Sequence, residues 1–262
     1  MDIVSKACDY QTLRVRFDQD IGFLQIHRPH ANNTISDQLV RELATVLEQC
    51  EQTAKVVVLE GSPEVFCFGA DFADLQHSSG TPGEQRQRSA EELYDLWLRL
   101  ATAPFVTIAH VRGKANAGGI GFVAACDIAL AEERAHFSLS ELLFGLMPAC
   151  VLPFLRRRIG LSRANYMTLS TQTISARQAL EWGLIDACEE NSESLLRKHL
   201  VRLRRLARPA ILRYKQYLTS LDDQLTAAKP AAIRANAQVF SDPENLQQIA
   251  RYVKTGRFPW ET

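Results

Sequence analysis

A glycine-rich loop that joins an apolar strand to a helix of small residues constrains this chain most. The strand is expected at residues 105–109, the loop contains Gly113, Gly118, Gly119 and Gly121, and an alanine-rich helical run follows. Glycine has no Cβ, so another group can approach the main chain closely along this loop. The first amides of a helix have no internal acceptor, and two such amides can stabilise an oxyanion. The stretch therefore predicts a main-chain site for a carbonyl oxygen.

Two other glycine motifs do not fit these residues. Gly118 is followed by Gly119 instead of Lys-Ser or Lys-Thr, which excludes a phosphate-binding P-loop. The glycines from Gly119 on lie inside a helix-forming run, and no suitable acidic residue follows about 20 positions later, which excludes a dinucleotide fingerprint. A tight turn with close helix packing and no ligand remains an open interpretation.

Glu141, downstream of this loop, stands among the apolar residues Leu139, Leu142, Leu143 and Phe144. Burial of a carboxyl group disfavours its charged form and raises its pKa. A carboxyl group with a raised pKa can both remove and return a proton near neutral pH. We therefore predict that Glu141 is an acid–base group.

A second stretch, residues 66–72, ends an apolar strand at Gly69, and Asp71 is expected to begin a helix. In the functional interpretation, the N–H of Ala70 is a donor that faces Gly118 across a site. In the alternative, Gly69 forms a turn and Asp71 caps a helix without any ligand.

The rest of the chain alternates strands with helices. Alternating apolar residues predict a β-hairpin over residues 13–27, followed by a helix with Thr34 as its N-cap and a buried strand at residues 55–60. His77 to Ser89 is polar and is expected to be a loop or lid. Further elements are expected as a helix with Leu93, Leu96, Trp97 and Leu100 on one face, an N-capped helix ended by Gly183, and three helices punctuated by Pro209, Pro230 and Pro243.

Composition excludes several classes of protein. The 262 residues carry 30 basic and 30 acidic side chains, which argues against binding of nucleic acid by overall charge. The six cysteines form no Cys-x-x-Cys pair, and the six histidines show neither metal-ligand spacing nor a nucleophile motif. No signal peptide and no apolar run of roughly 18 residues is found. We expect a cytoplasmic enzyme with no metal.

One segment is strongly basic, because no acidic residue occurs between Glu193 and Asp222. A solvated helix face is the plainer interpretation. The functional interpretation is a docking surface for an acidic partner such as a carrier protein, with Arg202, Arg204 and Arg205 as its contacts.

The two glycine stretches together, with Glu141 at its distance, resemble the crotonase superfamily of enoyl-CoA hydratases and isomerases. Arg28-Pro29 with Asn33, the Cys126-Asp127 pair and residues 174–186 extend the resemblance over nearly the whole chain. It implies an α/β fold, a crotonase-like spiral of ββα units over residues 1–195. Residues 196–262 would then form a C-terminal helical region that assembles trimers or hexamers.

The resemblance also implies roles for single residues. The N–H groups of Ala70 and Gly118 would form an oxyanion hole for a thioester, and Glu141 would be the acid–base group. No separate cofactor is implied, because the substrate is carried on coenzyme A or on the phosphopantetheine of an acyl carrier protein. Further substrate-binding residues would be Phe68, Asp71, Phe72 and Gly119, with Lys114, Asn116 and Tyr94 as candidate donors to a substrate carboxylate.

The chain departs from the family at one position. Two-glutamate hydratases carry their first glutamate where this chain has Gly121, so ordinary enoyl hydration is not implied. Within the family, the chain looks most like the dehydratases of polyketide β-branching cassettes. These remove water from 3-hydroxy-3-methylglutaryl on an acyl carrier protein, and a paired decarboxylase acts next. Alternatives are a decarboxylase or isomerase of the same fold, an acyl-CoA hydrolase, and a non-catalytic protein that binds RNA or a carrier.

Overall fold

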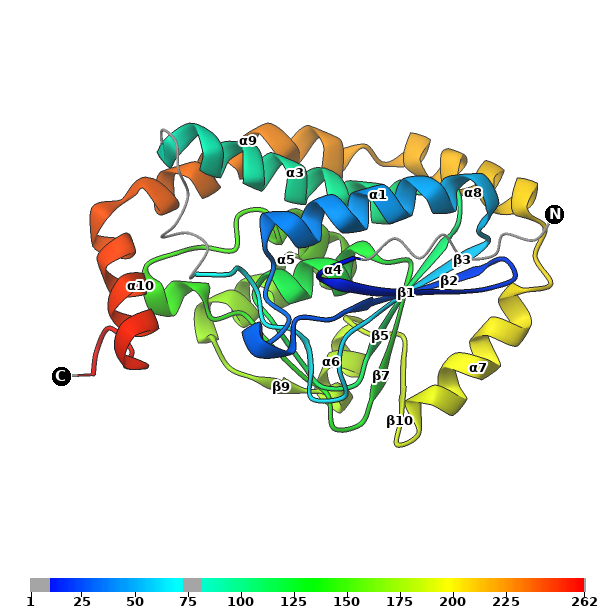
Figure 1. Ribbon diagram of the computed structural model, residues 1–262, viewed down its shortest axis with the longest axis horizontal. Coiled ribbons are helices and arrows are strands. Elements are labelled where there is room, and N and C mark those ends of the chain that lie inside the picture. The colour runs from blue at the N-terminus through cyan, green and yellow to red at the C-terminus, as the bar shows by residue number, and fades with distance from the viewer. Residues whose placement is uncertain (1–9, 73–81, 262) are drawn as a thin grey trace.

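A computed structural model describes residues 10–72 and 82–261, and Figure 1 shows its arrangement. In this part of the chain, the larger sheet has the order β1-β2-β3-β5-β7-β10. Its strands are β1 (Leu13–Asp18), β2 (Ile21–Ile26), β3 (Val56–Glu60), β5 (Val106–Val111), β7 (Ile128–Glu132) and β10 (Ala187–Glu189). β1 and β2 are antiparallel, and the other neighbours are parallel.

A smaller sheet has the order β4-β6-β8-β9, with β4 (Val65–Cys67), β6 (Lys114–Asn116), β8 (His136–Ser138) and β9 (Ile174–Ser175). β4, β6 and β8 run parallel, and β9 is antiparallel to β8. The carboxyl ends of β4, β6 and β8 therefore lie along one edge. The segments that follow these three strands contain both glycine stretches and Glu141.

The N-terminal elements follow the sequence pattern with one shifted cap. The predicted hairpin is confirmed as β1 and β2. α1 (Asp37–Thr53) begins after Ser36, whose hydroxyl accepts the Leu39 N–H. The predicted cap at Thr34 is therefore wrong, because the Thr34 side chain is bonded to Arg28 and Asp71 instead. A short 3-10 turn, η1 (Pro29–Ala31), precedes α1.

The predicted loop from His77 to Ser89 is wrong over residues 82–89, because these residues form the first turns of α3 (Pro82–Thr102). Residues 77–81 lie outside the described residues, as does most of the helix expected from Asp71. Asp71 itself is not helical. Leu96, Trp97 and Leu100 on α3 are buried, as their spacing predicts.

Helices cover both faces of the larger sheet. α1, α3 and α4 (Gly118–Ala125) share one core with its inner face, while α7 (Ser192–Leu203) packs on the other face through Leu195, Leu196 and Leu200. The boundary predicted at residue 195 falls inside α7, and the division into two regions stays a prediction. α5 (Leu152–Ser170) and α6 (Ala176–Trp182) follow the smaller sheet, and Ser175 and Gly183 cap α6 as expected.

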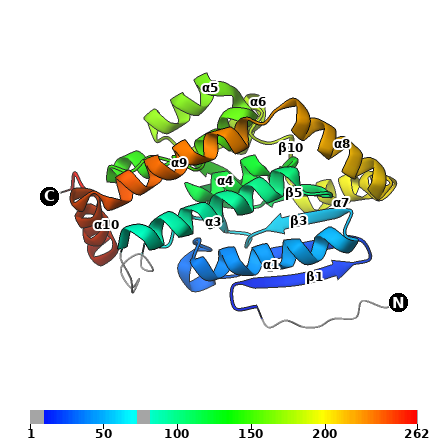
Figure 2. The same ribbon diagram turned by 90° about the horizontal axis from the view of Figure 1, so that it is seen from above.

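The C-terminal helices are α8 (Arg208–Leu221), α9 (Gln224–Ser241) and α10 (Pro243–Thr255). Pro230 lies inside α9 and does not separate two helices, contrary to the prediction. α10 packs against the 3-10 turn η2 (Glu141–Phe144). Both views place α10 and α7 at opposite ends of the molecule (Figures 1 and 2).

Among the described helices, none combines the length and apolarity that crossing a lipid bilayer requires.

Candidate active site

The two glycine motifs meet at the edge where β4 and β6 end. Gly69 has a positive φ of 94°, a conformation that glycine adopts without strain. A Cβ on Gly69 would lie 3.4 Å from the amide nitrogen of Gly118 and 2.7 Å from the Cβ of Ala117. The turn after β4 therefore packs directly on the start of α4, and a side chain at residue 69 would separate them.

Two main-chain N–H groups are available at this junction. A parallel bridge uses the Ile35 N–H, which donates to Gly69 O at 2.7 Å, and the Asp71 N–H, which donates to Ile35 O at 3.0 Å. This bridge does not use the N–H of Ala70, the residue between Gly69 and Asp71. Gly118 is the first residue of α4, where an N–H has no intrahelical acceptor. Within residues 10–72 and 82–261, neither of these two amides donates to a main-chain acceptor.

An ion pair fixes the turn that carries Ala70. The Arg28 guanidinium lies 2.8 Å from the Asp71 carboxylate and donates to Thr34 O at 2.6 Å. Asn33, in the loop before α1, accepts a hydrogen bond from the Arg28 N–H at 2.8 Å. It donates to Val65 O at 2.8 Å, which ties this loop to β4. Asp71 therefore holds the loop in place.

Glu141 follows β8 as the first residue of η2. Its Oε2 is buried and has no hydrogen-bond partner among the described residues. Burial raises the pKa of this carboxyl to about 7, while main-chain N–H groups at Glu141 and Ser140 act in the opposite direction. The direction agrees with the sequence prediction, and the group can change charge near neutral pH.

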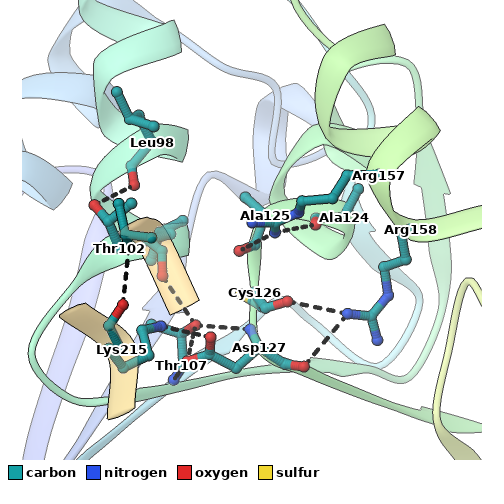
Figure 3. A network of polar contacts seen from close by, with 12 residues as sticks. Leu98, Thr102, Thr107, Ala124, Ala125, Cys126, Asp127, Arg157, Arg158 and Lys215 are labelled. Carbon is teal, nitrogen blue, oxygen red and sulfur yellow. Dashed lines mark hydrogen bonds and ion pairs between the residues drawn. The ribbon is translucent and has the colours of Figure 1, made fainter. Parts of the chain in front are cut away.

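The far end of α4 is covered by cations (Figure 3). Arg157 donates to Ala124 O at 3.2 Å, and Arg158 donates to Cys126 O at 3.1 Å. These guanidinium groups bind carbonyls at the C-terminus of α4 that have no intrahelical donor. Burial lowers the pKa of Arg157. The buried Lys215 of α8 pairs with Asp127 at 2.5 Å, so α4 is anchored from two helices.

The family model for enoyl-CoA hydratase/isomerase matches residues 16–262. The chain belongs to this family. It is 58% identical to the bacillaene synthase dehydratase PksH of Bacillus subtilis, over 100% of this chain and 99% of that protein. It is 32% identical to a probable enoyl-CoA hydratase of the same organism over 69% of this chain and 70% of that relative.

Solved structures agree with this assignment. A crystal structure of a polyketide biosynthesis enoyl-CoA hydratase (pksH) from Bacillus subtilis superposes with a TM-score of 0.89 at 56% identity, covering 95% of this chain and 100% of that one. An enoyl-CoA hydratase from Bacillus halodurans shares the fold with a TM-score of 0.83 at 22% identity, covering 92% and 99%. The predicted crotonase-like α/β fold is thereby confirmed. The chain is an enzyme of the hydratase/dehydratase type.

Two of the residues suggested as carboxylate donors have other partners. Tyr94 is a fully buried core residue, its O–H donates to Leu225 O at 2.6 Å, and its ring packs on Phe154. Burial also raises the pKa of Tyr94. Asn116 donates to Ser140 Oγ at 2.9 Å and accepts from Ser138 Oγ at 2.8 Å.

The remaining candidates divide by exposure. Lys114 is exposed at the start of β6, and Phe68 is exposed beside Gly69. Phe72 packs edge-on against Phe144 of η2, with ring centroids 5.7 Å apart. Gly119 is a packing residue, because a Cβ there would lie 2.3 Å from Cys67 O. Their roles in binding substrate stay predictions.

The residue that sequence reasoning missed is Trp97. A Cβ on Gly121 would lie 2.4 Å from Cζ2 of this indole, which therefore occupies the place of a side chain at residue 121. The sequence marked Trp97 only as part of an apolar helix face, since its contact with α4 depends on how α3 packs. A glutamate cannot be placed at residue 121 without displacing the ring. The substitution Gly121→Glu would therefore not simply restore the glutamate that the two-glutamate hydratases carry at this position.

A polar cluster surrounds His110 between β5 of the larger sheet and the start of α7. Glu60, His110 and Glu193 bring three potential metal ligands within 4.8 Å of one another. His110 bonds Glu60 at 2.8 Å and Ser192 at 3.0 Å, however, and Arg112 pairs with Glu193 at 3.2 Å. These contacts link α7 to the larger sheet.

The basic residues predicted for carrier docking lie on and just after α7. Arg202 and Arg205 line a surface groove with Arg197, Lys198 and Val201, and Arg204 pairs with Asp18. This surface is at the end of the molecule opposite α10 and η2 (Figures 1 and 2).

Proposed function

We propose that this enzyme removes water from a 3-hydroxy-3-methylglutaryl thioester on an acyl carrier protein, giving the 3-methylglutaconyl thioester, in the β-branching of a polyketide. The observation that carries the proposal is the 58% identity over the full chain to a dehydratase of bacillaene synthase. The proposal is supported by two amides without main-chain acceptors after β4 and β6, and by the buried carboxyl group of Glu141 after β8 of the same sheet.

The oxyanion hole stabilises the enolate formed in the first half of the reaction. The thioester oxygen accepts hydrogen bonds from the N–H groups of Ala70 and Gly118. These bonds stabilise the negative charge that moves onto the oxygen, and the α-proton becomes more acidic. Removing one donor of this kind from an enzyme typically costs about 2.7–4 kcal/mol of transition-state stabilisation. The Arg28–Asp71 pair and the cations around α4 hold the two donors in place.

Glu141 moves the proton. Its carboxylate takes the proton from the α-carbon, the C–H electron pair enters the enolate, and the C–O bond at the β-carbon then breaks. The same carboxyl gives its proton to the departing hydroxyl, so that water leaves and Glu141 is again a carboxylate. A pKa of about 7 suits a group that must serve as base and then as acid.

The reaction needs no separate cofactor in this proposal, because phosphopantetheine or coenzyme A only carries the acyl group. A paired decarboxylase would consume the product, and the assembly would be a trimer or hexamer. Exposed apolar side chains on α5 and α8 favour an interface between copies, and they include Leu161, Leu169, Tyr214, Tyr217 and Leu221.

Intact-protein mass spectrometry of the acylated carrier protein tests the proposal. We expect loss of one water with the enzyme, and a rate lower by about 10²–10⁴-fold with Glu141→Gln. Loss of carbon dioxide would indicate a decarboxylase, and release of the free thiol would indicate a hydrolase. Binding of carrier or RNA without any change of mass would indicate a non-catalytic protein.

Carrier docking on Arg202, Arg204 and Arg205 is a separate part of the proposal. Charge reversal of Arg202 and Arg205 should raise KM for the carrier-bound substrate and leave KM for the pantetheine thioester unchanged. An unchanged KM for both substrates would place the carrier elsewhere, in line with the position of α7 at the end of the molecule opposite α10 in Figure 1.

A further inference from the structure

The indole of Trp97 is packed in the core against α4. Its ring is 1% exposed and is held edge-on between Phe122 and Phe154, with both pairs of ring centroids 5.8 Å apart. A Cβ on Gly121 would lie 2.4 Å from Cζ2, 2.6 Å from Cη2 and 2.7 Å from Cε2 of this ring. The ring therefore lies directly against α4, the helix that begins with Gly118.

The indole atoms nearest to a Cβ on Gly121 belong to the six-membered ring and include Cε2. Cε2 is covalently bonded to Nε1, and Cζ2 lies 3.8 Å from the position of a Cβ on Gly118. The six-membered ring thus borders Gly121 and Gly118, and Gly118 carries one of the two amides of the proposed oxyanion hole.

This N–H is a buried donor with no acceptor among the described residues. A buried donor without an acceptor typically costs about 1–3 kcal/mol, and such groups are rare in native proteins. Oε2 of Glu141 is another buried polar atom without a partner among the described residues, as are the Nε atoms of Arg86, Arg112 and Arg208. The ring that carries the Trp97 donor borders Gly118 and Gly121, the Glu141 acceptor lies at the start of η2, and both are unsatisfied among the described residues.

We propose that the Trp97 N–H donates a hydrogen bond to the β-hydroxyl group of the substrate, the group that leaves as water. This inference rests on the dehydration proposed above. A hydroxyl group can accept from Trp97 and at the same time exchange a proton with Glu141. The indole keeps its proton throughout: Glu141 supplies the proton to the departing oxygen, while the N–H stabilises the negative charge that develops there.

The donor also accounts for the residue that stands at position 121. The two-glutamate hydratases that the sequence resembles place a carboxylate there, whereas this chain has Gly121 and fills the space with a neutral ring. The proposed substrate carries a free carboxylate of its own. A neutral N–H avoids the repulsion that a second glutamate would exert on that substrate in a site of low dielectric constant.

An isosteric replacement tests the hydrogen bond. Benzothienylalanine at position 97, introduced by site-specific incorporation, keeps the shape of the ring and replaces the N–H by sulfur. We expect kcat/KM for dehydration to fall by about 5- to 150-fold, as expected for loss of one hydrogen bond to a developing charge. Exchange of the α-proton with deuterated solvent depends on Glu141 as the base and on the two amides that stabilise the enolate. The rate of this exchange should change little.

Two matched proteins serve as controls. The same analogue at Trp182, which packs on Tyr166 away from α4, should leave both rates unchanged. A 5-fluorotryptophan at position 97 keeps the N–H and perturbs the packing of the ring, so a clearly smaller loss of rate than in the benzothienyl protein assigns the loss to the hydrogen bond. Equal loss of dehydration and of proton exchange in the benzothienyl protein would overturn the proposal.

A binding measurement tests the hydrogen bond even if the dehydration proposal fails. In a Glu141→Gln background, the pantetheine thioester of 3-hydroxy-3-methylglutarate is compared with that of 3-methylglutarate, which lacks the hydroxyl group. With Trp97 we expect tighter binding of the hydroxylated ligand, and with benzothienylalanine we expect this preference to disappear. If wild-type enzyme releases no water but the preference depends on the N–H, the proposed function is wrong and the donor role stands. A preference that is absent or unaffected by the analogue rejects the donor role.

Discussion

Replacement of Glu141 by glutamine should make the stability of this protein much less sensitive to pH. Burial raises the pKa of the carboxyl from 4.5 to about 7, because the charged form loses its hydration. A shift of this size corresponds to about 3 kcal/mol between the two protonation states. Glutamine has nearly the same shape and cannot ionise, so it removes this difference while keeping the packing of η2.

The sign follows from proton linkage. The folded state holds the Glu141 proton more tightly than the unfolded state, so its contribution to stability is fully present below pH 4.5 and is lost as pH rises to about 7. Between about pH 4 and about pH 8, wild type should lose about 3 kcal/mol relative to Glu141→Gln. The variant should therefore be the more stable protein on the alkaline side, although its turnover is lower by about 10²–10⁴-fold.

Urea unfolding at a series of pH values, at one fixed protein concentration because oligomers are concentration-dependent, measures this difference. Glu48→Gln, on the exposed face of α1, is the matched control and should give a curve parallel to wild type. If the curves of wild type and Glu141→Gln also run parallel, the carboxyl is solvated or paired, and the reasoning from burial is wrong.

Three further predictions follow from particular contacts. Activity on the proposed substrate should rise with pH through about 7 as Glu141 ionises, and a pH profile of kcat/KM that is flat across this range would contradict its role as base. Gly121→Glu should lower the free energy of unfolding by about 1–3 kcal/mol, since its Cβ overlaps Trp97, and should give no hydration of a simple enoyl-CoA. Lys215→Met should destabilise the fold by about 3–5 kcal/mol, because it leaves the Asp127 carboxylate without its buried cation, and Asp127→Asn in the same chain should recover much of this loss in thermal unfolding.

Local patterns in the sequence identified most elements and the two loops of the site. Apolar alternation predicts the β1–β2 hairpin, and the spacing of Leu96, Trp97 and Leu100 predicts the buried face of α3. The predictions at Pro230 and Thr34 were wrong, because Pro230 lies inside α9 without ending it, and because Ser36 caps α1 while the Thr34 side chain bonds Arg28 and Asp71.

The sequence by itself determined the main-chain chemistry: glycines at 69 and 118 permit close approach, and apolar neighbours raise the pKa of Glu141. Only the tertiary structure decided which side chains accompany them, because the ends of β4, β6 and β8 meet through sheet pairing between distant segments. Helix packing then buried Tyr94 against Phe154 and placed Trp97 on Gly121. Those contacts depend on the angle at which α3 crosses α4, and periodicity within either helix carries no information about that angle.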